Sequence, residues 1–143
     1  MTPRRATWAP ALPVYLRRTA LVGAITLVLT ALAGWIIGAT TGFWQALYTA
    51  PVLALAYNIL FEDPLRWRRV RQERWTLEES ALICHGTEGD SILPLSDILD
   101  VRARLGWTVV INLTGGQRVR IAYVERPREI AQQILAARQR IPA

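Results

Sequence analysis

The chain of 143 residues offers few side chains that can do chemistry. Its single cysteine, Cys84, is followed directly by its single histidine, His85. A thiolate beside an imidazole is typical of a catalytic dyad or of a pair of metal ligands. In an extended strand, however, adjacent side chains point to opposite faces. The pair therefore predicts a small core thiol and a surface imidazole, with no shared metal and no activated nucleophile.

Carboxylates and glycines also occur close together. Glu78 and Glu79 are typical of a turn, and Asp97 and Asp100 flank an apolar strand, which predicts solvated edges. The consecutive glycines at positions 115 and 116 predict a tight hairpin turn that needs positive φ. They do not predict a phosphate loop, because no helix start follows them. We expect no catalytic residue, no cofactor and no metal, and hence no enzyme.

The elements that position these residues follow from how apolar and charged residues are distributed. Hydrophobic residues make up 52% of the chain and charged residues 20%, with a net charge of +6. Residues 19–61 contain no charged residue and no histidine. A membrane-spanning helix needs about 20 apolar residues, so this run is long enough for two. Small residues at 38–42 predict a turn, which gives a transmembrane hairpin with spans at 19–38 and 43–61.

Two alternatives concern the same apolar region. A signal peptide cleaved after the run Ala31–Ala33 is possible, but a second apolar run follows almost at once. The two arginines at the start of the chain lack the surroundings of a twin-arginine export signal. The apolar region therefore predicts an integral membrane protein.

Arginines surround the predicted hairpin and set its orientation. Both flanks are basic and the connecting turn is uncharged, which predicts a multi-pass membrane protein with both termini in the cytoplasm. We expect these side chains to lie at the membrane surface near anionic lipids of the cytoplasmic leaflet. They are Arg4, Arg5, Arg17 and Arg18 in the basic segment 1–18, and Arg66, Arg68, Arg69, Arg71 and Arg74 in the basic juxtamembrane linker 62–74.

This distribution also excludes one class of function. Residues 75–143 carry eight arginines and eight acidic residues, so the cytoplasmic domain has no net charge. A nucleic-acid-binding domain is expected to carry a basic stripe or a recognised fold. We therefore expect no nucleic acid among the partners.

Small and aromatic residues indicate how the hairpin packs. Small residues recur every four positions in both predicted spans, and membrane helices associate closely along such stripes. The predicted packing residues are Thr26, Thr30, Gly34, Gly38, Ala46, Ala50 and Ala54. The two stripes face each other if the hairpin packs on itself, or face a helix of another subunit. Trp35, Trp44 and Tyr48 are predicted to lie at the far membrane interface.

The remaining segment, 75–143, has the pattern of a small α+β domain. Strand-like segments punctuated by glycine predict a first hairpin of 75–77 with 81–85, a loop at 86–90 and a short strand at 91–95. Residues 98–105 alternate, with Leu99, Val101 and Ala103 expected on the core face. Residues 107–113 alternate again, with the odd-numbered residues on the core face, and the paired glycines join them to the second strand of another hairpin. Pro127 opens a terminal helix with one apolar stripe. The fold class is therefore α+β: a two-helix hairpin, then a small antiparallel sheet or barrel capped by a C-terminal helix.

The order of these segments resembles the bacterial pleckstrin-homology (PH-like) domain. The resemblance covers about residues 70–141 and depends on Trp75-Thr-Leu, on Ile92-Leu-Pro-Leu-Ser-Asp-Ile98 and on the proline-opened helix. It implies a split, seven-stranded barrel-like sandwich with one open end plugged by the helix. Domains of this family often follow a pair of transmembrane helices, so the resemblance implies that the chain lies in the bacterial inner membrane. The resemblance implies no catalytic residues.

Two functions remain open. In the first, the chain is an accessory or assembly subunit that docks on a larger integral membrane protein complex, respiratory or photosynthetic by analogy with the family. In the second, the domain senses anionic lipid headgroups. Arginines at positions 102, 104, 118 and 120 would then join the juxtamembrane contacts. The acidic turn at 78–80 argues against the second function, because the eukaryotic namesake has a basic loop there.

Overall fold

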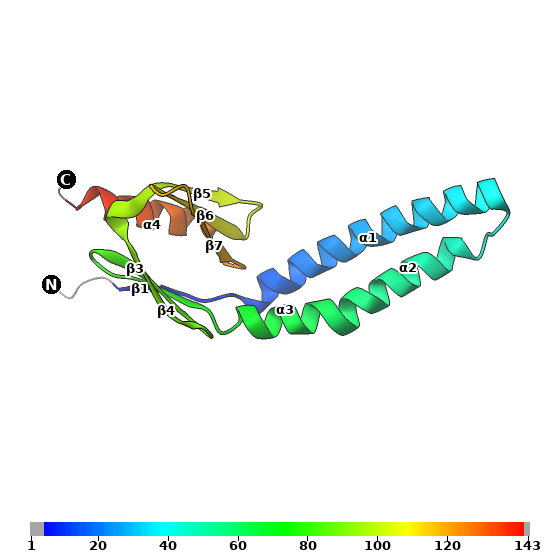
Figure 1. Cartoon of the computed structure of the whole chain (residues 1–143), viewed down its shortest axis with the longest axis horizontal. Coiled ribbons are helices and arrows are strands. Elements are labelled where there is room, and N and C mark those ends of the chain that lie inside the picture. Colours follow the sequence, from blue (N-terminus) through cyan, green and yellow to red (C-terminus); the bar gives the residue numbers. More distant parts are fainter. Residues whose placement is uncertain (1–4, 142–143) are drawn as a thin grey trace. The chain divides into compact units, whose positions relative to one another are not determined.

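The computed structural model describes residues 5–141. The described residues divide into two compact units: a sheet unit formed by residues 5–14 and 69–141, and a helical unit formed by residues 15–68 (Figure 1). The sheet unit is therefore discontinuous in sequence, because the helical unit is inserted after its first strand.

The helical unit contains two antiparallel rods. The first is α1, Leu12–Thr41, which has 30 residues. The second begins with α2, Ala46–Tyr57, continues through the π-helical turn η1, Asn58–Glu62, and ends with α3, Asp63–Val70. Residues 62–74, predicted as a linker, are therefore largely helical.

Two predicted boundaries of the hairpin are wrong. The predicted turn at 38–42 is too early, because α1 continues to Thr41. The hydroxyls of Thr40 and Thr41 donate to the carbonyls of Ile36 and Ile37, at 2.9 and 2.7 Å. These bonds stay within the last turn of the helix, so the small polar residues extend α1 instead of ending it. The second predicted span, 43–61, is not one α-helix, since α2 ends at Tyr57.

Within the described residues, α1 is the one helix that is long and apolar enough to cross a membrane. Its most apolar stretch has a mean hydropathy of 2.3, and only 6% of that stretch is buried. The helix α2 is too short to pass the same test by itself. The prediction of a pair of spanning helices is thus met by one helix only.

The first sheet has four antiparallel strands in the order β1-β2-β3-β4. They are β1, Ala6–Trp8; β2, Arg74–Leu77; β3, Ala81–Gly86; and β4, Gly89–Pro94. The hairpin of β2 and β3 confirms the predicted one. The predicted loop at 86–90 is wrong: β3 and β4 meet in a tight turn, with Gly89 at φ +113°. Strand β1 was not predicted.

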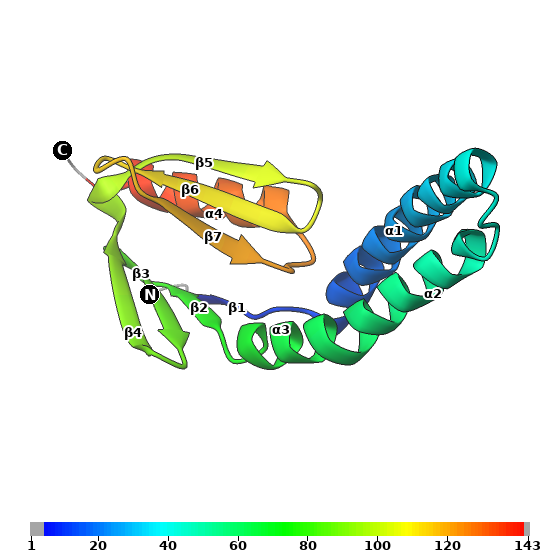
Figure 2. The same ribbon diagram turned by 45° about the vertical axis from the view of Figure 1, so that its right-hand side comes forward.

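The second sheet has three antiparallel strands in the order β5-β6-β7 (Figure 2). They are β5, Ile98–Arg104; β6, Thr108–Leu113; and β7, Arg118–Ala122. A 3-10 turn, η2, Leu95–Asp97, joins β4 to β5. The hairpin between β6 and β7 turns at Gly116 with φ +76°, as the paired glycines predicted.

The predicted alternation in β5 is wrong at the start of the strand. A bulge lies between Ile98 and Asp100, so that Ile98 is fully buried and Leu99 is exposed. Because a bulge inserts one residue into a strand, it shifts the face on which the preceding side chains lie. From Val101 onward the predicted core face is correct.

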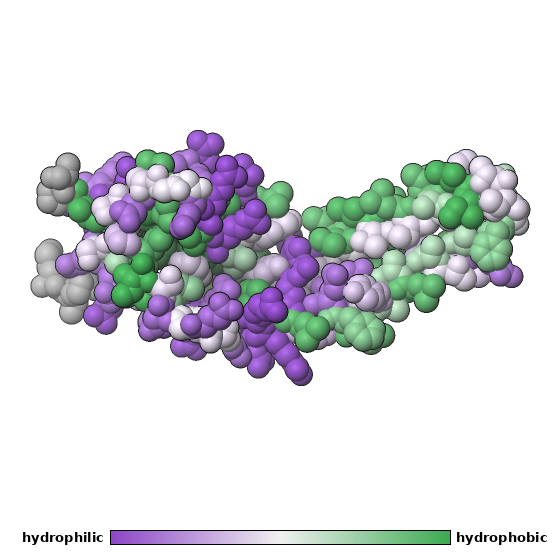
Figure 3. Space-filling view, in the orientation of Figure 1, coloured by the Kyte–Doolittle hydropathy of each residue, from purple (hydrophilic) through white to green (hydrophobic). Residues whose placement is uncertain are grey.

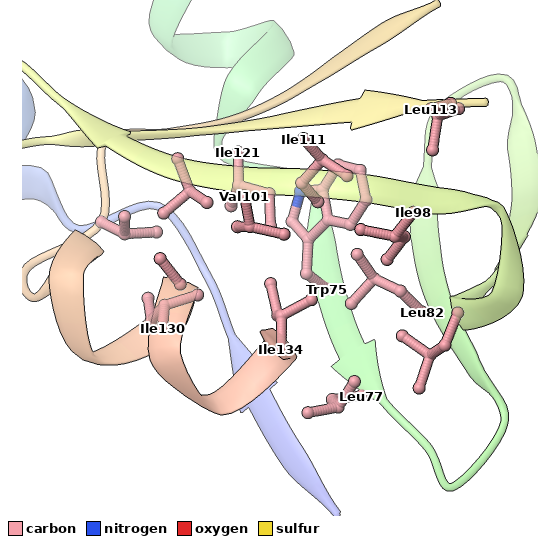
Figure 4. Packing of buried hydrophobic residues seen from close by; sticks show 14 residues of the cluster. Trp75, Leu77, Leu82, Ile98, Val101, Ile111, Leu113, Ile121, Ile130 and Ile134 are labelled. Atoms are coloured by element: carbon pink, nitrogen blue, oxygen red, sulfur yellow. The ribbon is translucent and has the colours of Figure 1, made fainter. Parts of the chain in front are cut away.

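The core of the sheet unit lies between the two sheets and α4, Pro127–Gln139. Figure 4 shows the Trp75 side chain at the centre of the cluster, with Ile111 close to its ring, Val101 to its left and Ile134 of α4 below it. The stripe of α4 is buried at Ile130 and Ile134, as its spacing predicted. Seven strands and one capping helix thus form an antiparallel α+β unit.

Candidate functional site

The pair that first suggested chemistry is divided between two faces of β3. Cys84 packs against the core, whereas the His85 ring is exposed. The His85 Nδ1 lies 2.7 Å from Asp90 Oδ1 on the neighbouring strand. Among the described residues, no group of three or more histidine, cysteine or acidic side chains is placed to hold a metal ion. This arrangement positions a surface hydrogen bond instead of a reactive pair.

The Cys84 thiol is also electrostatically unsuited to nucleophilic work. Burial raises its pKa above the ordinary value, and the negative charges of Glu73 and Asp90 raise it further. Burial likewise raises the pKa of the Glu73 carboxyl. Since the thiolate is the reactive form of cysteine, a raised pKa lowers reactivity near neutral pH.

The acidic pairs lie apart from each other at the surface of the sheet unit. Glu78 forms an ion pair with Arg5 at 3.7 Å, which joins the chain before β1 to the β2–β3 turn. Asp97 accepts a hydrogen bond from the Ser96 hydroxyl at 3.2 Å. Asp100 pairs with Arg102 at 2.5 Å.

The small residues predicted to pack lie along the seam between the two rods. Gly34 and Gly38 are buried in α1, and Ala46 is buried in α2. A Cβ at Gly34 would lie 2.4 Å from the Ala46 carbonyl oxygen, and one at Gly38 would lie 2.7 Å from the Trp44 ring. Half-buried positions continue the seam at Thr26, Thr30, Ala50 and Ala54. The structure thus brings the two stripes together within one hairpin.

The second rod contacts α1 again beyond its π-helical turn. In that turn the Asp63 N–H donates to the Asn58 carbonyl, five residues earlier. The Tyr15 hydroxyl then donates to the Asp63 carbonyl at 2.7 Å, and its ring lies 4.8 Å from the Trp67 ring.

The opposite sides of the rods expose large apolar side chains. Figure 3 shows hydrophobic side chains over much of the visible surface of α1 and α2. Trp35, Trp44 and Tyr48, the predicted interfacial aromatics, are 54%, 52% and 60% exposed. An exposed apolar surface of this extent is expected to contact lipid or another protein.

The predicted membrane-surface arginines are mostly exposed. Arg4 lies outside the described residues. Arg66 pairs with Glu62 at 3.8 Å, one helical turn away, and Arg18 is half-buried. The exposed members are Arg5, Arg17, Arg66, Arg68, Arg69, Arg71 and Arg74.

Sequence reasoning missed how charge is separated between the two sheets. Residues 74–97, which contain β2 to β4, carry five acidic residues and one arginine, Arg74. Residues 98–123, which contain β5 to β7, carry four arginines and one aspartate. A count over each predicted strand would have found this division, although the sum over the domain is zero.

The register of β5, β6 and β7 gathers those arginines on one face. Arg102 lies across β6 from Arg120, with Val110 between them. Arg104 and Arg118 continue the same outward alternation along β5 and β7, opposite the buried Val101 and Ile121. We call this surface the arginine face: Arg102, Arg104, Arg118 and Arg120, all of them exposed.

A groove of about 440 Å³ lies elsewhere in the sheet unit, between the chain that follows β1 and the start of α4. Its lining includes Trp8, Pro10, Ile130 and Gln133. Its charged lining residues are Glu125, Arg126 and Glu129, and Arg126 approaches Glu129 at 3.4 Å. This ion pair neutralises two of the three charges.

Comparisons of the chain with protein-family models, with curated proteins and with solved structures find no match. The functional argument therefore depends on the surfaces described above.

Proposed function

We propose that the chain is a non-enzymatic, membrane-anchored accessory or assembly subunit of a bacterial inner-membrane protein complex. The α1–α2 hairpin is its anchor, and the sheet unit is a cytoplasmic interaction domain of PH-like type. The arrangement of four plus three antiparallel strands with a C-terminal helix supports the PH-like assignment, which the sequence resemblance suggested.

The observation that carries the proposal is the pairing of β1 with β2. Strand β1 precedes α1, and β2 follows α3, yet the two strands pair from Ala6 with Leu77 to Trp8 with Trp75. If α1 crosses a membrane, the chain must cross it again before β2, because paired strands lie on the same side. The second rod, 46–70, supplies that return although it is not one regular α-helix.

The same pairing argues against a cleaved signal peptide. Cleavage after Ala33 would remove β1 from the sheet together with the core contacts of Trp8. The low burial of α1 argues against the core helix of a soluble protein, since such helices are mostly covered by other elements.

Docking on a protein complex is favoured over a purely lipid-directed role by the charges of the sheet unit. Its strands β2 to β4 and their turns, residues 74–97, carry five acidic residues and one arginine. That surface is repelled by an anionic membrane, whereas an interaction domain tolerates separate patches of either sign. The alternative, a membrane-anchored anionic-lipid sensor, depends on the exposed arginines that flank the hairpin.

Cysteine labelling tests the anchor. In a Cys84→Ser background, Thr41→Cys places a thiol at the hairpin turn and Arg128→Cys places one on α4. A membrane-impermeant maleimide added to intact spheroplasts is expected to label position 41, and to label position 128 only after permeabilisation. Labelling of both positions, or of neither, in intact spheroplasts overturns the topology.

Co-purification tests the docking role. The tagged chain, extracted in mild detergent, is expected to migrate with a stoichiometric set of membrane proteins on a native gel. A variant whose residues 12–70 are replaced by an unrelated two-span hairpin serves as the matched control and is expected to lose part of that set. A chain that migrates alone, and that flotation assays find bound only to anionic liposomes, supports the alternative.

A further inference from the structure

The arginine face is strongly positive, and acidic side chains of the same chain neutralise little of this charge. Arg102 is paired with Asp100 at 2.5 Å. Within the part of the chain that the structure describes, Arg104, Arg118 and Arg120 take part in no ion pair. Like charges on one face of a sheet repel each other and reduce stability. Several like charges are expected on a single face where an anionic partner binds that face.

Most acidic residues of the same unit lie outside β5, β6 and β7. Glu73 precedes β2, and Asp97 lies in η2 between the two sheets. Glu78, Glu79, Glu88 and Asp90 belong to the first sheet and its turns, whereas Glu125 and Glu129 follow β7, where Glu129 pairs with Arg126. Of the side chains that β5, β6 and β7 place on the face, Asp100 is the one acid. The face therefore keeps an excess of three positive charges.

The basic side chains have the chemistry of carboxylate recognition. All 17 basic residues of the chain are arginines. The guanidinium group binds a carboxylate through two parallel hydrogen bonds, which the ammonium group of lysine does not do. The remaining polar side chains of the face, Thr108 and Asn112, add further hydrogen-bonding groups between the arginines.

The spacing of the arginines matches an extended polypeptide. Arg118 and Arg120 are two residues apart on β7, as are Arg102 and Arg104 on β5, so each pair is separated by about 7 Å along its strand. Alternate side chains of an extended segment project at the same interval. Strand β7 is also an edge strand of its sheet, and such an edge can pair with an added strand.

We propose that the arginine face binds an extended acidic segment of a partner protein, with carboxylates at alternate positions. This inference rests on the proposed function, since the segment belongs to the complex on which the chain docks. A single-stranded nucleic acid fits less well, because the side chains that β5, β6 and β7 place on this face include no aromatic ring for base stacking. Lipid headgroups have no fixed spacing that would select these pairs.

The test uses the full chain in a neutral detergent and a fluorescein-labelled peptide of twelve residues in which glutamate and threonine alternate. Fluorescence anisotropy measures binding to the wild type and to Arg118→Glu/Arg120→Glu. The matched control is Arg128→Glu/Arg140→Glu, which makes the same change of charge on α4. Its effects at the two ends of that helix oppose each other, because glutamate is favoured at the start and disfavoured at the end.

Reversal at 118 and 120 is expected to weaken peptide binding at least tenfold, and the control less than twofold. Equal losses in the two variants, or no binding by the wild type, overturn the proposal. Two further outcomes overturn the proposal. In the first, Arg118→Glu/Arg120→Glu abolishes binding of an oligothymidine. In the second, this variant abolishes co-flotation of the nanodisc-reconstituted chain with phosphatidylglycerol vesicles while peptide binding persists.

Co-purification separates this proposal from the one on which it rests. If only the arginine face is wrongly assigned, the wild type and Arg118→Glu/Arg120→Glu both retain the co-purifying membrane proteins. If the docking function itself is wrong, the wild type lacks them as well.

Discussion

Trp8 lies directly opposite Trp75 in the register of β1 and β2, although the whole helical unit separates them in sequence. Trp75 is buried at the centre of the core and Trp8 is half-buried beside it. A sheet that contains strands from before and after an inserted hairpin places both ends of that hairpin on one side of any membrane it enters.

The first prediction concerns this strand pair. Trp8→Ala is expected to destabilise the sheet unit by about 2 kcal/mol, roughly half the cost for a fully buried aromatic residue. Thr7→Ala, at an exposed position of the same strand, is the control. It is expected to change the free energy of unfolding by less than about 0.5 kcal/mol, as is usual for surface substitutions. Pulsed alkylation of Cys84 along a urea gradient measures the opening of this unit. Equal midpoints for both variants would show that β1 is not part of the folded sheet.

A second prediction tests the helix seam. Gly34→Ala introduces a Cβ 2.4 Å from the Ala46 carbonyl oxygen, so the rods must move apart. A cost of about 1–3 kcal/mol is expected from such overpacking. Gly23→Ala makes the same change in the same helix, where the nearest atom lies 3.8 Å away, and is expected to be tolerated. The stability of the two variants is compared by denaturation in mixed micelles with increasing dodecyl sulfate. A similar loss of stability in both variants would refute close packing at Gly34.

The third prediction concerns the contact between α1 and α3. Tyr15→Phe removes the hydroxyl that donates to the Asp63 carbonyl and keeps the ring beside Trp67. The loss of this hydrogen bond is expected to cost about 1 kcal/mol. Tyr48→Phe, at an exposed position, is expected to leave the midpoint of the same denaturation unchanged. An unchanged midpoint for Tyr15→Phe would show that the hydrogen bond does not stabilise the hairpin.

The fourth prediction follows from the raised pKa of Glu73. The folded protein holds this proton more tightly than the unfolded chain, so stability falls as pH rises from the ordinary value of 4.5 to the folded-state pKa. Glu73→Gln stays neutral at every pH, and its stability advantage over the wild type is expected to grow through that interval and then stay constant. Urea midpoints between pH 3 and pH 8 measure the difference. An advantage that shrinks as pH rises contradicts the direction of the shift.

A fifth prediction uses the same carboxylate and the single thiol. Because the charge of Glu73 contributes to the raised pKa of Cys84, Glu73→Gln is expected to lower that pKa. Alkylation of the native protein by iodoacetamide at pH 8 is then expected to be faster than in the wild type. Glu88→Gln is the control and is expected to leave the rate unchanged. A slower rate in Glu73→Gln would count against the electrostatic coupling.

Several features of the fold were predictable because they depend on local pattern. The apolar stripe of the terminal helix, the glycine turn before Arg118 and the core face of β6 follow from periodicity and turn chemistry alone. The exposure of Leu99 was not predictable, because a bulge depends on how β5 pairs with β6. The extension of α1 to Thr41 depends on hydroxyl–carbonyl bonds that compete with a turn.

The candidate interaction surfaces likewise have some properties that the sequence determines and others that only the tertiary structure decides. The order of residues alone determined that a long uncharged segment is flanked by arginines, because this property is read along the chain. Tertiary structure decided that β1 joins β2 across the inserted helices and that four arginines from β5 and β7 share one face. Strand pairing brings together residues that sequence distance separates, so a domain neutral in sum gathers four arginines on one face of a sheet.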